Sequence, residues 1–288
     1  MTIDAICLKE AVHLAFRHPK YWIVVAGAAV NRVLHPKRGK VFNASYFFCR
    51  HADDFLDGDR KIKGNPEEYV LKIVEGMKER TSDSPKILDL YHYAIEELDK
   101  LKERRDDPEQ AFARVIHGHS LFDYDRSKQP TLLSLEELGR YYRDSFEPVL
   151  DISMIIAGSR FRGADLLELV HSTGHLYSIR DMKTDLSRNI INIPRDEIAK
   201  SRIASVDRGI TAEQVMDDSH LCRWMYNEVA NYMGIVTTFE KDVVSSMEPI
   251  AKKVCIPWIK AMQRFGKRYL EQNESYLELN PHTVDLVD

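Results

Sequence analysis

The sequence is poor in several features that mark particular classes of protein. Only 4 of its 288 residues are cysteine, Cys7, Cys49, Cys222 and Cys255, and no two of them form a C-x-x-C pair. This argues against a disulfide framework or a zinc ribbon and is typical of a reduced, cytosolic protein. No G-x-G-x-x-G turn is present, so the sequence gives no support for a Rossmann-type nicotinamide site.

Charge and long apolar runs are also limited. The chain has 41 Lys and Arg against 45 Asp and Glu, a formal net charge of −4, and no long basic stripe, so we expect no nucleic-acid partner. The longest apolar run, residues 23–30, falls far short of the ~20 residues that a membrane span requires. The first residues lack the basic and then apolar pattern of a signal peptide. We expect a cytoplasmic protein with at most peripheral membrane contact.

What the sequence has is helical periodicity along nearly its whole length. Gly (13) and Pro (11) are few, 44% of the residues are hydrophobic, and no alternating strand pattern stands out. We therefore predict an all-α protein with one domain over residues 1–275 and a loosely ordered tail over 276–288. The expected helices cover residues 3–16, 21–34, 37–59, 67–80, 85–104, 108–122, 134–158, 164–188, 196–200, 211–246 and 250–275.

Some segments carry more specific expectations. Residues 21–34 are so apolar that we expect them to be buried on most sides. The charged run 102–107 is expected to be a solvated turn, and residues 123–130 a loop. Ser134 and Glu137 have the spacing of a capping box at the start of a long helix.

One stretch concentrates acidic residues directly after an apolar and aromatic run. In a helix, Asp53 and Asp57 are four residues apart and project from one face. Like charges at that spacing cost a helix roughly 0.2–0.5 kcal/mol, which a divalent cation between the carboxylates would offset. Asp54 points about 100° away, so it either supports the metal ligands or faces solvent.

The same spacing returns once, at Asp181 and Asp185. Carboxylate oxygens suit Mg²⁺, a hard cation that also binds substrate phosphates. A single D-x-x-x-D pattern is often only a solvated helix face. Two copies, each beside an arginine and flanked by apolar residues, favour a metal site.

Three stretches resemble the squalene/phytoene synthases, enzymes of the head-to-head prenyltransferase type. They are residues 34–38 (LHPKR) with 45–57 (SYFFCRHADDFLD), residues 137–149 (ELGRYYRDSFEPV), and residues 180–197 (RDMKTDLSRNIINIPRDE). The middle stretch is most similar to the hopanoid-pathway squalene/hydroxysqualene synthase branch. The similarity covers about residues 10–200, and the order of the stretches makes it specific.

The resemblance implies a fold and a metal site. The fold is a single-domain, all-α, isoprenoid synthase-type bundle around a central cavity, with two facing Asp-rich helices. The expected Mg²⁺ ligands and catalytic residues are Asp53, Asp57, Asp181 and Asp185, with the metal holding the diphosphate of an allylic prenyl substrate.

The resemblance also suggests residues that bind the substrate. Arg38, Arg50 and Arg188 are candidates for contacts to the diphosphate, whose leaving oxygens gain charge as the C–O bond ionises. The carbocation left behind needs an apolar, water-poor cavity. Phe47 is a candidate for its wall, and so are the aromatic rings of Tyr46 and Tyr177, which can stabilise a cation by about 0.5–2 kcal/mol each.

The chain departs from the family pattern beside the second acidic motif. Gly174 and Tyr177 stand where the family has Gln and Asn, and Lys183-Thr184 replace Gly-Glu. The leading hypothesis is head-to-head coupling of two prenyl diphosphates. The altered positions keep open a second one, prenyl transfer to a small aromatic or similar acceptor. A third is a non-catalytic family member, against which the four retained aspartates argue.

Other candidate positions are less specific. His171 and His175 have helical spacing for a zinc site, but no H-E-x-x-H pattern is present, so we interpret them as structural histidines. Trp224 and Met225 belong to an apolar cluster whose simplest role is core packing. In this family such a cluster can also form a wall of the prenyl tunnel.

Overall fold

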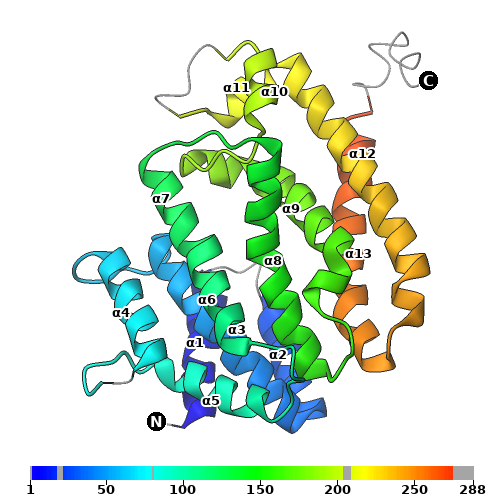
Figure 1. Cartoon of the computed structure of the whole chain (residues 1–288). Coiled ribbons are helices and arrows are strands. Elements are labelled where there is room, and N and C mark those ends of the chain that lie inside the picture. The colour runs from blue at the N-terminus through cyan, green and yellow to red at the C-terminus, as the bar shows by residue number, and fades with distance from the viewer. Residues whose placement is uncertain (1, 18–21, 80, 204–208, 275–288) are drawn as a thin grey trace. The chain divides into compact units, whose positions relative to one another are not determined.

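The computed structural model describes residues 2–17, 22–79, 81–203 and 209–274, except the side chains of residues 23 and 24. All regular structure in these residues is helical, which confirms the all-α prediction (Figure 1). The helices are α1 (Ile3–Arg17), α2 (Trp22–Leu34), α3 (Pro36–Leu56), α4 (Pro66–Lys78), α5 (Leu88–Asp99), α6 (Pro108–Val115), α7 (Phe122–Lys128), α8 (Leu135–Ala157), α9 (Leu167–Ser187), α10 (Arg195–Lys200), α11 (Ala212–Met216), α12 (Ser219–Asp242) and α13 (Pro249–Gln272).

Residue contacts divide the chain into two compact units. Unit 1 comprises Met1–Tyr124 and Pro148–Gly163, and unit 2 comprises Asp125–Glu147 and Ala164–Asp288. Helix α8 contributes to both, and the division falls at Pro148. A single domain over residues 1–275 stays a prediction, and the expected tail, 276–288, lies outside the described residues. No helix in the described part of the chain is long and apolar enough to cross a membrane.

Helix α3 is the centre of unit 1. It packs against α1, α2, α4 and α5, and its apolar side chains are buried along most of its length. The ring of Phe48 packs on those of Tyr91 and Phe112, with ring centroids 5.2 and 5.6 Å away. Pro36 at the first turn begins the helix. This packing fixes the acidic end of α3 on a buried scaffold.

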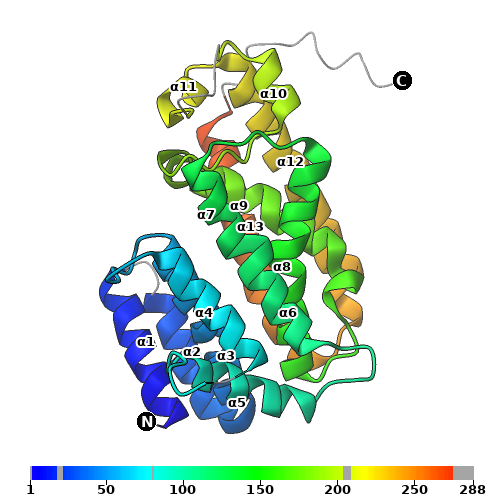
Figure 2. The same cartoon turned by 60° about the vertical axis from the view of Figure 1, so that its left-hand side comes forward.

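Helices α1 and α2 form a hairpin on α3, seen at the lower left of Figure 2. Asp4 accepts a hydrogen bond from Arg32 at 3.2 Å and so joins the start of α1 to the end of α2. The prediction that residues 21–34 are buried on most sides is wrong for the described side chains. Trp22 and Val33 are 57% and 76% exposed.

Residues 108–128 form one continuous helical rod. Helices α6 and α7 are joined by a π-helical turn, Ile116–Leu121. The loop predicted over 123–130 is therefore wrong up to Lys128, where the rod ends. π-Helical turns occur frequently at functional sites, and this one packs against α3.

Helix α9 is the centre of unit 2 and packs against α12 and α13. Gly174 leaves room for the ring of Tyr142 from α8, because a Cβ at residue 174 would lie 2.1 Å from Tyr142 Cγ. The capping box predicted for α8 is present. The Ser134 amide donates to Glu137 at 2.7 Å, and the Glu137 amide donates to the Ser134 hydroxyl at 3.2 Å.

The helix predicted over 211–246 is two helices. Asp218 ends the continuity because its carboxylate caps α12, accepting from the Leu221 amide at 2.9 Å. Thr211 and Gln214 form a separate capping box on α11. The apolar pattern of the sequence does not reveal this break, and the caps decide where each helix begins.

Candidate active site

The first acidic pair lies at the C-terminal end of α3. The Asp57 amide donates to the Asp53 carbonyl at 2.8 Å, so Asp57 continues the helical path by one residue. The two side chains therefore leave the helix on the same side, as the four-residue spacing predicts. Both residues are partly exposed.

Arg50 lies among three carboxylates of this motif. Its guanidinium nitrogens are 2.6 Å from Asp53, 2.7 Å from Asp54 and 3.4 Å from Asp59. Its predicted role in diphosphate binding stays a prediction, because here its contacts are with the acids. The side chain of Asp54 is 4% exposed, and burial raises its pKa. The alternative in which Asp54 faces solvent is therefore wrong.

Asp53 has a second partner that the sequence did not reveal. The Ser120 hydroxyl, in the π-helical turn, lies 3.3 Å from Asp53 Oδ1 and donates to it. Ser120 is 67 residues away in the sequence and buried. No local spacing could have indicated this contact.

A buried polar network supports the turn after α3. Arg60 donates to Glu10 Oε2 at 2.7 Å and also contacts His51, whose Nε2 lies 2.9 Å from the Tyr69 hydroxyl. The Arg60 amide donates to the Asp54 carbonyl at 2.8 Å. Burial acts to raise the pKa of Glu10, but the hydrogen bonds from His51 and Arg60 outweigh it and lower the pKa. Charged groups of α1 thereby anchor the acidic end of α3.

The second acidic pair lies in the last two turns of α9. Arg180 donates to both oxygens of Asp181, at 3.0 and 2.5 Å, in the bidentate geometry typical of Arg and carboxylate. The same guanidinium lies over the Tyr177 ring, 3.7 Å from its centroid. Burial raises the pKa of Tyr177, so its hydroxyl stays protonated at neutral pH. Arg180 thus links the ring of Tyr177 to the carboxylate of Asp181.

Asp185 is held from another direction. Asn192 donates to Asp185 Oδ2 at 3.1 Å and accepts at its own Oδ1 from Arg126 at 3.0 Å. Arg126 is 3% exposed and also donates to the Ile191 carbonyl at 2.5 Å. Neither Arg126 nor Asn192 was a candidate from the sequence. Arg126 fell in the expected loop, and its two partners, Asn192 and Ile191, lie more than 60 residues away in the chain.

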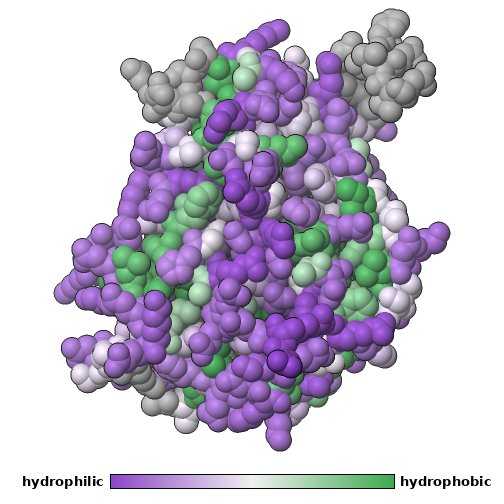
Figure 3. Space-filling model, viewed as in Figure 1, coloured by the Kyte–Doolittle hydropathy of each residue, from purple (hydrophilic) through white to green (hydrophobic). Residues whose placement is uncertain are grey.

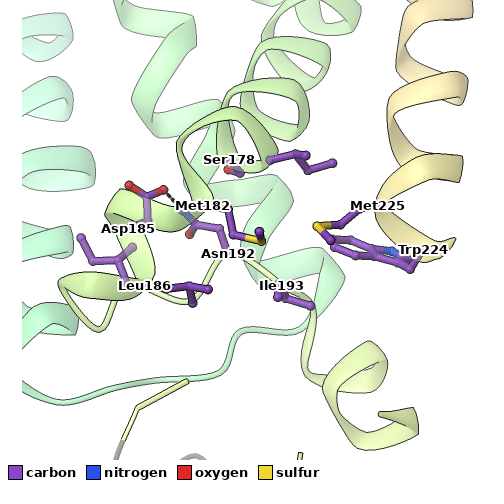
Figure 4. A pocket seen from close by; sticks show the side chains of 10 residues that line it. Ser178, Met182, Asp185, Leu186, Asn192, Ile193, Trp224 and Met225 are labelled. Atoms are coloured by element: carbon purple, nitrogen blue, oxygen red, sulfur yellow. Dashed lines mark hydrogen bonds between the residues drawn. The ribbon is translucent and has the colours of Figure 1, made fainter. Parts of the chain in front are cut away.

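A hollow opens beside Asp185 on the side of α9 that faces α12 (Figure 4). Apart from Asp185, Asn192 and Ser178 its lining is apolar. It is lined by Ser178, Ile179, Met182, Asp185, Leu186, Ile190, Asn192, Ile193, Trp224 and Met225. The expected apolar cluster of Trp224 and Met225 therefore borders a cavity as well as the core.

The remaining predicted substrate residues have structural contacts. Arg38 donates to the Ala157 carbonyl at 2.8 Å and lies against Gly158 at the end of α8. Phe47 is 2% exposed, and its ring meets that of partly buried Tyr46 edge to face at 5.3 Å. Arg188 directly follows α9 as its C-terminal cap residue. The substrate contacts of these residues stay predictions.

His175 has a structural role, as the sequence suggested. Its Nδ1 lies 2.8 Å from Glu228 Oε2, and its ring stacks on Tyr232 with centroids 4.1 Å apart. Burial lowers the pKa of the neighbouring His171. The described side chains of His, Cys, Asp and Glu form no group of three that could hold a metal ion.

The two carboxylate pairs nevertheless fit Mg²⁺ in the way that it usually binds. Mg²⁺ prefers hard oxygen donors and is commonly held by one or two carboxylates together with substrate phosphates, with waters completing its octahedron. Asp53 with Asp57 in unit 1, and Asp181 with Asp185 in unit 2, each supply two such carboxylates. Each pair is suited to a metal that arrives with a diphosphate.

A comparison with models of protein families matches residues 28–272 to squalene/phytoene synthase. The chain belongs to this family. Squalene/phytoene synthases are prenyltransferases, so the chain is an enzyme of that class, as the resemblance implied. The match includes both aspartate pairs and extends over the helices of the C-terminal third.

A solved structure gives an independent comparison of the fold. The chain is similar to squalene synthase HpnC from Alicyclobacillus acidocaldarius, with a TM-score of 0.67 and 16% sequence identity over 94% of this chain and 96% of that chain. At this identity the likeness shows the fold alone. The comparison with curated proteins gave no match.

Proposed function

We propose that this squalene/phytoene synthase ionises an allylic prenyl diphosphate in a Mg²⁺-dependent reaction and couples it head to head to a second prenyl diphosphate. The product would be of the squalene or phytoene type. The observation that carries the proposal is the pair of D-x-x-x-D motifs at the C-terminal ends of α3 and α9. Membership of a prenyltransferase family supports it.

The position of the motifs is electrostatically unfavourable without a cation. The C-terminal end of a helix carries partial negative charge, so an acid there is disfavoured by about 0.3–1 kcal/mol. Asp53, Asp57 and Asp185 lie in or directly after the last turn of such a helix, and each of the four aspartates has another acid four residues away. Arg50 and Arg180 offset part of this charge. Mg²⁺ bound between the carboxylates, together with the diphosphate, would offset the rest of this negative charge.

The chain's own residues have distinct roles in the proposed reaction. Asp53, Asp57, Asp181 and Asp185 would hold the metal, which when bound neutralises charge on the departing diphosphate. The guanidinium of Arg50, which lies beside Asp53, would share its charge with a phosphate oxygen. The apolar side chains beside Asp185 would form part of the wall that keeps water from the reactive carbocation.

A second candidate differs in the acceptor. Around α9, Tyr142 fills the space beside Gly174, and Tyr177 stacks on Arg180 where the family has a carboxamide. These aromatic rings favour an alternative in which one prenyl group is transferred to a small aromatic molecule. The retention of both aspartate pairs argues against a third possibility, a non-catalytic family member.

The test is to incubate the full chain with Mg²⁺ and, separately, with C10, C15 and C20 prenyl diphosphates, measuring pyrophosphate release and extracted products. A coupled C30 or C40 product supports the proposal and names the substrate. Pyrophosphate release with only the hydrolysed alcohol overturns head-to-head coupling and favours another acceptor. No turnover with any of the three, with or without aromatic co-substrates, overturns both enzymatic candidates.

Variants make this test specific to the acidic pairs. We expect Asp53→Asn and Asp181→Asn each to lower kcat by about 100-fold or more, since each removes a metal ligand. The control is Asp242→Asn, because Asp242 is also an acid at the C-terminal end of a helix, α12, but is exposed. Unchanged turnover in Asp53→Asn would sink the assignment.

A further inference from the structure

The outer face of the α1–α2 hairpin is an apolar exposed surface of unit 1. It comprises the exposed side chains of Leu8, Val12, Phe16, Trp22, Val30 and Val33. Leu8, Val12 and Phe16 recur every four residues on α1, and Trp22, Val30 and Val33 share one side of α2. Phe16 is 82% exposed and Leu8 66%. We call this surface the α1–α2 outer face.

Each apolar stripe lies apart from the buried side of its own helix. Both helices pack on α3, and α1 and α2 contact each other. The buried side of α1 includes Ile6, Glu10 and Leu14, opposite its exposed stripe. The two stripes therefore lie on neighbouring helices, and both are exposed to solvent. By contrast, the view of the molecule in Figure 3 is largely hydrophilic, with apolar residues in separate small groups.

The charges around the outer face are of one sign. Between residues 8 and 37 the sequence has five basic residues, Lys9, Arg17, Lys20, Arg32 and Lys37, and a single acid, Glu10. Lys9, Arg17 and Lys37 are exposed, whereas Glu10 is buried and bound to Arg60. A ligand of this surface should therefore be apolar and negatively charged.

We infer that the α1–α2 outer face docks on an anionic lipid surface. A helical surface with an apolar face and basic residues beside it lies in the plane of a membrane interface, with aromatic side chains at the headgroup level. Phe16 and Trp22, at the two helix ends of the hairpin, are placed for that contact. Anionic headgroups complement the exposed Lys9, Arg17 and Lys37.

Charge argues against a second copy of the chain as the occupant. In a two-fold dimer the same patch meets itself. Lys9, Arg17 and Lys37 would then approach the same basic residues of the other copy, and the described part of the hairpin offers only Asp4 as an exposed acid, which already pairs with Arg32 and Lys40. A lipid surface has no such conflict.

The experiment is sedimentation of the full chain with vesicles, without Mg²⁺ or substrate, so that its result does not depend on the proposed function. Vesicles of phosphatidylcholine alone are compared with vesicles in which a third of the lipid is phosphatidylglycerol. We expect binding to the anionic vesicles. Retention of the chain in the supernatant with both kinds overturns the inference.

Two variants of the outer face and one control locate the contact. Phe16→Asp with Val33→Asp, or separately Leu8→Asp with Trp22→Ser, should weaken binding to vesicles by at least about tenfold. Each double change removes two apolar side chains that would be buried in the lipid. Replacing Lys9, Arg17 and Lys37 by Gln should abolish the preference for anionic lipid. The control Leu71→Asp with Leu135→Asp changes exposed leucines of α4 and α8 and should bind like the parent.

Three results would contradict the inference. One is that both outer-face variants bind the vesicles as well as the parent does and have unchanged thermal stability. Another is an equal loss in the control. The third is a dimer of the parent in sedimentation equilibrium that the outer-face variants dissociate, without vesicle binding by the parent, which would make the surface an interface between copies.

Discussion

Asp106 shows how one residue can differ from the charged run in which it lies. Its carboxylate accepts two hydrogen bonds from Arg162, both at 2.6 Å, and its side chain is only 3% exposed. Arg162 also donates to the Ser159 carbonyl at 2.5 Å. The segment before α6 is thus joined to the segment after α8 within unit 1. The expectation of a solvated turn over 102–107 fails here, although most of the run is exposed.

Replacing Asp106 should reduce stability in a pH-dependent way. Asp106→Asn removes a charged hydrogen-bond partner of Arg162, and we expect the free energy of unfolding to fall by about 1.5–3 kcal/mol at neutral pH. Burial acts to raise the pKa of Asp106, but Arg162 and the Glu103 amide outweigh it, so the folded pKa is lowered. The contribution is therefore full above the unfolded pKa of about 3.9 and is lost as pH falls through the lower folded value.

Urea unfolding of the parent and of Asp106→Asn, from pH 7 down to about pH 3.5, measures this contribution. The gap between the two proteins should be constant from pH 7 to pH 5 and narrow below. Asp99→Asn is the control, because Asp99 is 46% exposed and its ion pair is with exposed Lys102. A variant as stable as the parent at pH 7, or a gap that widens in acid, would contradict the prediction.

At the scale of helices, the packing of α8 on α9 depends on the missing side chain of Gly174. Glycine in a helix is usually unfavourable by about 0.5–1 kcal/mol relative to alanine. Here the Tyr142 ring occupies the position of the absent Cβ. The sequence shows Gly174 only as a departure from the family pattern, and the structure supplies the reason.

Two glycine-to-alanine variants should therefore have effects of opposite sign. Gly174→Ala forces the Tyr142 ring to move, and we expect it to destabilise unit 2 by about 1–3 kcal/mol. Gly234→Ala, at an exposed position of α12 where an added Cβ would have nothing within 4 Å, should stabilise by up to about 1 kcal/mol. Chemical denaturation measures both, and Tyr142→Leu should restore much of the loss in Gly174→Ala. Equal effects of the two changes would show that Tyr142 does not matter.

The helices also show what the sequence could not reveal. Asp53, Asp57, Asp181 and Asp185 were found because their spacing within a helix is a local property. Ser120 and Arg126 were missed because their partners are distant in the chain. Asn192 is only seven residues from Asp185 but lies after the end of α9, where helical spacing no longer indicates which side chains meet. The helix predicted over 108–122 stopped short of the observed end at Lys128. The polar residues after 122 have the composition of a loop, and a π-helical turn has no clear sequence pattern.

For the molecule as a whole, helical periodicity was enough to predict the all-α class but not its division into units. Residues 148–163 belong to the same unit as residues 1–124, and a return of this kind depends on contacts rather than on composition. The order of the motifs predicted the family correctly, and the family match covers residues from both units. What the periodicity did show is where regular helix should end, near residue 275.

The extent of the domain can be tested at that end. The last buried residue of α13 is Gly266, against which Met233 packs, and the Asn273 amide closes the helix by donating to the Tyr269 and Leu270 carbonyls. The family match ends at residue 272. We therefore propose that the folded domain extends to about residue 275.

A chain that ends at residue 275 should unfold within about 2 °C of the full chain, a difference of less than about 1 kcal/mol, and should keep its turnover. A chain that ends at residue 258 is the matched comparison, because it lacks Ile259, Met262 and Gly266, which are buried in unit 2. We expect it to unfold at a much lower temperature, since each lost large apolar side chain contributes about 1.5–3 kcal/mol. A clear loss of stability or turnover on removal of residues 276–288 alone would instead assign that segment a part in the folded enzyme.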